Sequence, residues 1–134
     1  MFNYLEKHKV WLVYIPLIIY WIILFTATTL PGPQLPDIHL SDKIEHFGAF
    51  FVLAVLLNLA LIYQRKSYLL YNYATLVTII ICFSYGAVDE LHQMFIPGRS
   101  ADIRDWLADS TGVLVGVFLL KIVKNLFNYK VKFE

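Results

Sequence analysis

The sequence predicts an all-α membrane protein, in which four transmembrane helices form an antiparallel bundle with both termini in the cytoplasm. Of its 134 residues 59% are hydrophobic, and its mean hydropathy of +0.63 is high for a soluble domain. Four apolar segments approach the length of about 20 residues that a helix needs to cross a bilayer. Since no repeat or linker divides the chain, residues 1–134 are expected to form a single domain.

The apolar segments are interpreted as helices joined by short loops, which makes neighbouring helices antiparallel. The first segment contains Pro16, which transmembrane helices tolerate. Three prolines and a glycine between Leu30 and Asp37 predict a loop. Ser41 or Asp42 is placed to cap the next helix, with Glu45 as the acid of a capping box. The expected helices cover residues 10–28, 44–63, 68–88 and 102–123.

The distribution of charge predicts the orientation in the membrane. Eight of the eleven Lys and Arg residues lie at the two termini or in the loop at 64–66: Lys7, Lys9, Arg65, Lys66, Lys121, Lys124, Lys130 and Lys132. The positive-inside rule places that side in the cytoplasm. The opposite side holds the other three, Lys43, Arg99 and Arg104, and eight of the ten acids. The polar residues are therefore expected on the extracytoplasmic side.

Composition argues against a nucleic-acid-binding protein and against an internal disulfide. The net charge is +1 and no basic stripe or zinc-finger spacing is present, so nucleic acid is not an expected partner. The single cysteine, Cys82, lies in an apolar run and has no partner for an internal disulfide. It is expected to be a small buried hydrophobic residue.

The stretch from Tyr85 to Asp109 interrupts this apolar pattern. It contains five acids, two arginines, a histidine and a glutamine between two long hydrophobic runs. Charged residues at a membrane boundary are costly, so they indicate a functional site. A solvated loop is the simpler alternative, but the polar residues continue into the flanking segments at helical spacing.

Three polar clusters are predicted to meet at the extracytoplasmic end. Asp102, Asp105 and Asp109 form one acidic stripe that continues into Gly112 and Gly116, a small-residue pair expected to pack against another helix. The other two clusters are shorter and each shares one helix face. They consist of Asp42, Lys43 and His46 at the start of the second helix, and of Glu90 and Gln93 at the end of the third.

Each cluster also has a purely structural interpretation. Asp42 and Glu45 can cap a helix, and acids in the first turn of the fourth helix favour its dipole. The dipole does not account for Asp109, which lies nearly two turns into that helix. Arg99 and Arg104 can neutralise the aspartates as ion pairs, and His46 can be a bundle histidine with its hydrogen bonds satisfied. The functional interpretation rests on the presence of all three clusters at the same end.

The motifs in these clusters resemble those of the VanZ-like family of small bacterial membrane proteins. In chain order they are D-K-x-x-H at Asp42, Lys43 and His46 with Phe50 one turn on, E-x-x-Q at Glu90 and Gln93, P-G-R-S at Pro97 to Ser100, and D-x-x-x-[ND]-x-x-G at Asp105, Asp109 and Gly112. The resemblance implies a four-helix, multi-pass protein of the bacterial cytoplasmic membrane, in the cell envelope. The family's namesake is associated with reduced susceptibility to teicoplanin. Asp109 stands where asparagine is frequent in the family.

The first functional hypothesis is a binding protein of the cell envelope. Its ligand would be a membrane lipid head group, a lipid-linked wall precursor or a lipoglycopeptide. Arg99 or Lys43 would hold an anionic group, since Arg presents a planar fork of donors. The expected ligand-binding residues are Asp42, Lys43, His46, Glu90, Gln93, Arg99, Asp105 and Asp109.

The alternative is a metal-dependent intramembrane enzyme that acts on a lipid-linked phosphate or diphosphate. Asp102, Asp105 and Asp109 have the spacing of an acidic motif that holds Mg²⁺ in UbiA-type prenyltransferases, and hard oxygen ligands suit Mg²⁺. Those enzymes are larger and use a second acidic motif that this sequence lacks. The candidates for catalytic residues are His46, Glu90 and Asp105, and a zinc site that uses His46 with carboxylates is a further possibility.

Overall fold

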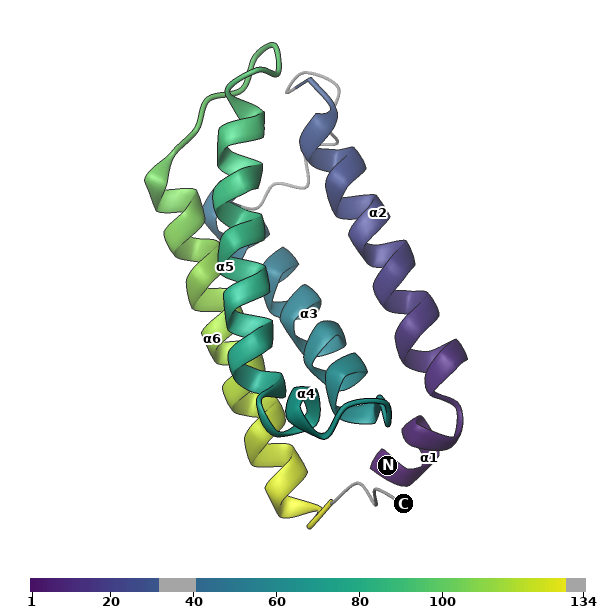
Figure 1. Cartoon of the computed structure of the whole chain (residues 1–134). Coiled ribbons are helices and arrows are strands. Elements are labelled where there is room, and N and C mark those ends of the chain that lie inside the picture. The colour runs from purple at the N-terminus through teal and green to yellow at the C-terminus, as the bar shows by residue number, and fades with distance from the viewer. Residues whose placement is uncertain (32–40, 130–134) are drawn as a thin grey trace.

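Helices account for the secondary structure throughout the part of the chain that the computed structural model describes, residues 1–31 and 41–129. Four of them are long and apolar enough to cross a membrane and run alternately up and down, as predicted (Figure 1). The helices are α1 (Phe2–Lys7), the π-helix η1 (Val10–Tyr14), α2 (Ile15–Thr29), α3 (Asp42–Tyr63), α4 (Tyr68–Asn72), α5 (Ala74–Gln93) and α6 (Ile103–Leu126).

Two helix boundaries differ from the predicted ones. The third apolar segment, expected as one helix over 68–88, breaks at Tyr73, whose φ of −102° and ψ of 16° are not helical. Ser67 caps the short α4 by accepting a hydrogen bond from the Leu70 N–H, and a separate helix, α5, then extends to Gln93. This extension matters for the site, because it keeps Glu90 within a regular helix.

The first membrane span is continuous from Val10 to Thr29 but changes its winding. It begins as the π-turn η1 and continues as α2, with Pro16 in the first turn of α2. Proline lacks an N–H and its ring crowds the carbonyl four residues earlier, so the wider turn before Pro16 accommodates it without a break.

Some predictions fall wholly or partly outside the described residues. The loop expected between Leu30 and Asp37 lies mostly in residues 32–40, and Lys130 and Lys132 lie in residues 130–134. Ser41 is the N-cap residue of α3, but its side chain makes no capping hydrogen bond. Asp42, the other candidate for the N-cap, is instead the first residue of the helix, so this prediction is wrong.

The contact between α3 and α6 organises the bundle, and two glycines of α6 make it possible. A side chain at Gly112 would collide with the backbone carbonyl of Phe47, and a Cβ at Gly116 would lie 2.9 Å from the Phe51 carbonyl oxygen. The predicted small-residue pair is thus a packing surface, as expected. It places the first turns of α6 directly beside those of α3.

Apolar side chains fill the bundle next to this contact, while α2 contributes little to it. Phe50, Leu53 and Val113 belong to a buried cluster that also contains Cys82, which confirms the expected burial of the cysteine. No residue of α2 is buried. This helix therefore lies at the side of the bundle (Figure 1). It contacts α3 and α5, and residues of these three helices line a cavity.

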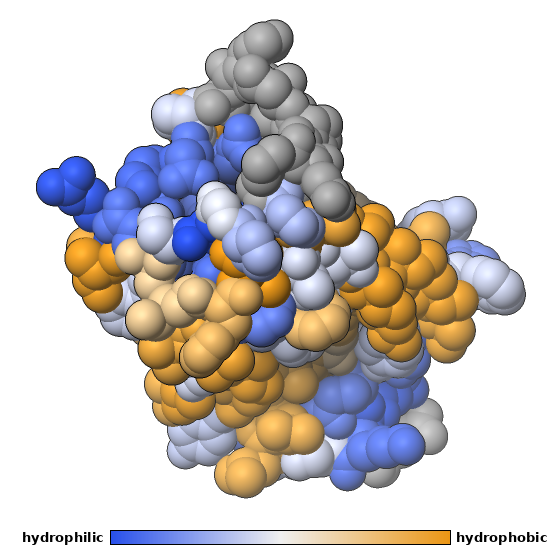
Figure 2. Space-filling view, turned by 90° about the horizontal axis from the view of Figure 1, so that it is seen from above, coloured by the Kyte–Doolittle hydropathy of each residue, from blue (hydrophilic) through white to orange (hydrophobic). Residues whose placement is uncertain are grey.

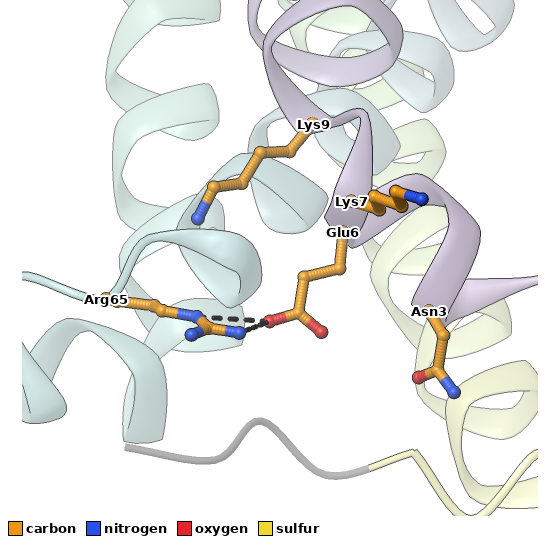
Figure 3. A pocket seen from close by; sticks show the side chains of 5 residues that line it. All are labelled: Asn3, Glu6, Lys7, Lys9 and Arg65. Atoms are coloured by element: carbon orange, nitrogen blue, oxygen red, sulfur yellow. Dashed lines mark hydrogen bonds and ion pairs between the residues drawn. The ribbon is translucent and has the colours of Figure 1, made fainter. Parts of the chain in front are cut away.

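At the end of the bundle where α1 lies, Glu6 connects three parts of the chain. It accepts hydrogen bonds from Arg65 Nη2 at 2.6 Å and from the Tyr129 hydroxyl at 2.7 Å. Lys9 donates to the Tyr63 carbonyl at 2.6 Å. Figure 3 shows Arg65 directed toward Glu6 across a cavity of about 490 Å³. The start of the chain is thereby joined to the α3–α4 loop and to the segment after α6.

We expect Glu6→Gln to lower stability at neutral pH but not at strongly acidic pH. Burial acts to raise the pKa of Glu6, but the Tyr129 hydroxyl and Arg65 guanidinium outweigh it and lower this pKa. A lowered folded-state pKa stabilises the protein above the unfolded pKa of about 4.3, and that contribution disappears as pH falls through the folded value. Thermal unfolding in detergent should show a loss of about 1 kcal/mol at pH 7 that disappears at strongly acidic pH, where Glu6 is protonated in both states. An equal loss at both pH values would contradict this account.

Candidate functional site

Polar side chains gather at the other end of the bundle, where α3 and α6 begin and α5 ends. Seen from this end in Figure 2, hydrophilic side chains lie beside the grey segment, with hydrophobic surface around them. Several of these polar residues are buried although they belong to membrane-spanning helices: Asp89, Glu90, Gln93, Asp105, Asp109 and Ser110. Burial of this many polar groups has a high energetic cost, so their partners decide what the site can do.

Lys43 is the cation that holds the start of α6 against the start of α3. Its amine forms ion pairs with Asp102 at 3.1 Å and with the buried Asp105, and contacts its neighbour Asp42 at 3.2 Å. Asp102 also caps α6 by accepting a hydrogen bond from the Arg104 N–H. That bond and the nearby Lys43 lower the pKa of Asp102. With three carboxylates around it, Lys43 acts as a counter-ion within the protein.

His46, one turn further along α3, pairs with the next acid of the stripe. Its Nδ1 lies 2.9 Å from Asp109 Oδ1, and its Nε2 lies 3.8 Å from Asp42 Oδ1. Asp109 is 1% exposed, and its second oxygen, Oδ2, has no hydrogen-bond partner among the described residues. That oxygen is directed at Gly86 of α5, where a Cβ would come within 3.3 Å of it. In the acidic stripe, Asp102 and Asp105 therefore pair with Lys43, whereas Asp109 pairs with His46.

Glu90 of α5 joins this group from the third helix. Its Oε2 accepts a hydrogen bond from the backbone N–H of Asp102 at 2.8 Å, while its Oε1 is buried and finds no partner in the part of the chain that the structure describes. Glu90, His46 and Asp109 each offer a ligand atom, and these atoms lie within 4.8 Å of one another. Asp42, His46 and Asp105 form a second such set in the described residues, more exposed than the first. Asp102 belongs to neither set.

A cavity of about 260 Å³ lies beside this cluster, between α2, α3 and α5. Its apolar wall includes Leu24, Ala27, Ala49 and Phe50, and its polar wall includes Asp42, Glu45, His46, Asp89, Gln93 and Arg99. The volume is slightly below that of typical small-molecule pockets, about 300–1,000 Å³. The cavity therefore has room for a polar head group but not for a whole lipid.

Arg99 lines the cavity and carries a positive charge that no carboxylate of the described residues neutralises. It donates to the carbonyls of Ala27 at 2.9 Å and Leu30 at 3.2 Å, at the end of α2, and contacts Gln93 Oε1 at 3.4 Å. No ion pair within residues 1–31 and 41–129 involves it. Arg99 therefore both fixes the end of α2 and brings a cation to the cavity wall.

The structure brings the predicted site residues together at one end, in two overlapping groups. Gln93 and Arg99 line the cavity, and Lys43, Glu90, Asp105 and Asp109 belong to the polar cluster. Asp42 and His46 belong to both. Arg104 is exposed, and His92 stacks on Phe25 at 5.9 Å.

Three residues that contribute to the site were not among the predicted ligand-binding residues. Glu45, interpreted from the sequence as a capping acid, lines the cavity. Asp89 is 3% exposed, lines the cavity and accepts a hydrogen bond from Gln93 at 3.1 Å. Its spacing of four residues from Gln93 is the sequence signal that could have identified it. Gly86, one turn before Glu90, makes space for the Asp109 carboxylate, and no sequence pattern marks that role.

Comparison with known proteins places this architecture in a family. A family model described as VanZ/LLP1 matches residues 10–124. An uncharacterized protein, C11E3.10 of Schizosaccharomyces pombe, is 29% identical over 114 residues, which cover 84% of this chain and 63% of that protein. The chain thus spans about 63% of the length of this relative. No solved structure matches. With four membrane-spanning helices and a family match over most of its length, the chain is a multi-pass membrane protein that belongs to the VanZ/LLP1 family.

Proposed function

We propose that this protein binds the polar head group of a membrane amphiphile in the cavity between α2, α3 and α5. The single observation that carries the proposal is Arg99, a cation with no carboxylate partner in the described residues, on the wall of a cavity at the end of the membrane spans. A phosphate on a lipid is the anionic group that such a site would meet at this depth, and an Arg fork matches it. In this proposal Arg99 takes the anionic group, while Lys43 remains with its three carboxylates.

The acids that share the polar wall with Arg99 support a head group that also carries an amine or hydroxyl. Asp89 is buried and holds Gln93, and Glu45 and Asp42 line the same space. Carboxylates accept hydrogen bonds from amines and hydroxyls. The apolar residues Leu24, Ala49 and Phe50 suit the glycerol and first methylenes of an acyl chain. Together these features favour a zwitterionic or hydroxylated phospholipid head group.

Several envelope ligands share this chemistry. A lipid-linked wall precursor has the same phosphate and hydroxyl groups, and a lipoglycopeptide has amines and an acyl chain. The cavity volume of about 260 Å³ suits the head group of an ordinary membrane phospholipid better than these larger ligands. This favours a membrane phospholipid as the ligand, with a teicoplanin-related role as a specialised use of the same site. We propose that the cavity faces the extracytoplasmic side, because the basic residues favour a cytoplasmic position for the termini.

The alternative of an Mg²⁺-dependent enzyme built on the aspartate stripe has less support. Asp102 and Asp105 are paired with Lys43, and Asp109 is paired with His46. A cation such as Lys43 between two of the proposed ligands competes with Mg²⁺ for the same oxygens. Head-group binding needs no change in these contacts.

We expect Arg99→Gln to weaken phospholipid binding by about tenfold, which corresponds to about 1.4 kcal/mol for the loss of a charge-assisted contact. Binding would be measured by native mass spectrometry of the purified full chain with phosphatidylethanolamine, phosphatidylglycerol and the uncharged diacylglycerol. Diacylglycerol should bind weakly to both proteins, since it lacks the phosphate.

Two matched variants separate charge from position. Arg104→Gln removes an exposed cation from the same end of the bundle and should leave lipid binding unchanged. Arg99→Lys keeps the charge but loses the forked hydrogen bonds to Ala27 and Leu30, so it should retain part of the affinity. Equal lipid binding by wild type and Arg99→Gln would refute the proposed function.

A further inference from the structure

His46, Glu90 and Asp109 form a buried group that does not include Arg99, the residue on which the proposed lipid site depends. The head-group proposal does not explain why two carboxylates are buried together in this group. Each residue comes from a different helix, α3, α5 and α6, and their ligand atoms lie within 4.8 Å of one another. Glu90 is 7% exposed and Asp109 is 1% exposed. An acidic group this deeply buried needs compensating positive charge.

The hydrogen-bond partners of Asp109 and Glu90 in the structure do not fully compensate these two carboxylates. His46 Nδ1 contacts only one oxygen of Asp109, and the other, Oδ2, is buried without a hydrogen bond. Glu90 Oε1 is likewise buried and unpartnered. Two orphaned carboxylate oxygens in one buried group are unusual, because buried polar atoms are nearly always paired. A bound cation would supply the positive charge that these two carboxylates lack.

We propose that His46, Glu90 and Asp109 form a binding site for a divalent first-row transition-metal ion such as Zn²⁺ or Mn²⁺. A divalent cation would neutralise both carboxylates and take the place of the proton shared between His46 Nδ1 and Asp109 Oδ1. One imidazole nitrogen with two carboxylates suits Zn²⁺ or Mn²⁺ better than Ca²⁺, which takes six to eight oxygen ligands. This donor set differs from the Mg²⁺ stripe, because it omits Asp102 and Asp105.

Groups around the three residues are placed as outer partners of metal ligands usually are. Metal-bound histidines direct their second ring nitrogen to a carboxylate or carbonyl, and His46 Nε2 lies 3.8 Å from Asp42 Oδ1. Ligating carboxylates are in turn hydrogen-bonded, and Glu90 Oε2 accepts from the Asp102 N–H. Gly86 leaves the space that the Asp109 carboxylate occupies. The site is thus supported from α3, α5 and the start of α6.

Three protein ligands leave a coordination position open, which is the pattern of zinc sites that bind a further molecule. His46 also lines the 260 Å³ cavity. The inferred ion therefore lies at the border of the cavity, but the proposal stands whether or not a lipid binds there.

The test uses the purified full chain in detergent, stripped with EDTA and dialysed. Calorimetric titration with Zn²⁺ and with Mn²⁺ should show one ion per chain, and binding should release protons, detectable as a dependence of the heat on the buffer. Glu90→Gln and Asp109→Asn preserve side-chain shape and should each weaken binding by more than about tenfold. Mg²⁺ should compete poorly.

Asp102→Asn is the matched control, since the Asp102 side chain lies outside the proposed set and the substitution keeps the backbone N–H that donates to Glu90. It should bind the ion as wild type does. Loss of binding in Asp102→Asn together with retention in Glu90→Gln would overturn the proposal in favour of the aspartate stripe. If a variant folds poorly, the proposal is tested on the wild-type protein alone, by its thermal midpoint with Zn²⁺ and by mass spectrometry of the bound ion. A thermal midpoint unchanged by Zn²⁺, with no ion retained by mass spectrometry, would show that the group is held by protons instead.

Discussion

Replacing Gly112 by alanine is expected to destabilise the bundle by about 3 kcal/mol, at the upper end of typical overpacking costs. A Cβ at Gly112 would overlap the backbone carbonyl of Phe47, and it would also approach the Phe51 N–H at 3.1 Å. Backbone atoms cannot rotate away as a flexible side chain does, so α6 must move from α3. Unfolding in mixed micelles or a thermal melt would measure the loss.

The matched control for this variant is Gly48→Ala, on the opposing helix. A Cβ at Gly48 meets nothing within 4 Å. Alanine is a better helix former than glycine by up to about 1 kcal/mol, so Gly48→Ala should be neutral or slightly stabilising. If both variants unfold alike, close approach at Gly112 does not hold the two helices together. Because Asp109 lies three residues before Gly112, the same displacement should also weaken ion and lipid binding at the polar end.

The second large effect is expected from breaking the pair between His46 and Asp109. His46→Leu removes the partner of a carboxylate that is 1% exposed, and loss of one member of a buried pair costs about 3–5 kcal/mol. Chemical or thermal unfolding in detergent would measure the loss.

The double variant His46→Leu with Asp109→Leu tests the origin of this cost. When both partners are apolar, no uncompensated charge remains, and replacement of a buried pair is often neutral. We expect the double variant to recover most of the stability that His46→Leu loses, while its ion binding stays abolished. A double variant as unstable as the single one would show that packing, and not charge, explains the effect.

These two effects meet at one structural feature, the close contact between the first turns of α3 and α6. The glycines bring the helices together, and the ion pairs of Lys43 and His46 then bridge them. Glu90 completes the cluster from α5. The predicted stability and the predicted binding therefore depend on the same helix spacing, and each can be measured in the same variants.

The sequence by itself determined the fold class, the four spans and the end at which the polar residues meet. Segment length and hydropathy are properties of the local chain, so they require no knowledge of tertiary contacts. The antiparallel order follows from short loops, and it necessarily places the start of α3, the end of α5 and the start of α6 together. The spacing of Gly112 and Gly116 likewise marked a packing face correctly.

Only the tertiary structure decided which polar groups pair, because pairing depends on how each helix is rotated about its axis and how closely it approaches its neighbours. Asp102, Asp105 and Asp109 share one face in the sequence, yet the fold assigns the first two to Lys43 and the third to His46. Arg99 is turned to the end of α2 instead of to an aspartate. The unpartnered oxygens of Glu90 and Asp109 arise where three helices meet, a geometry that no spacing within a single helix encodes.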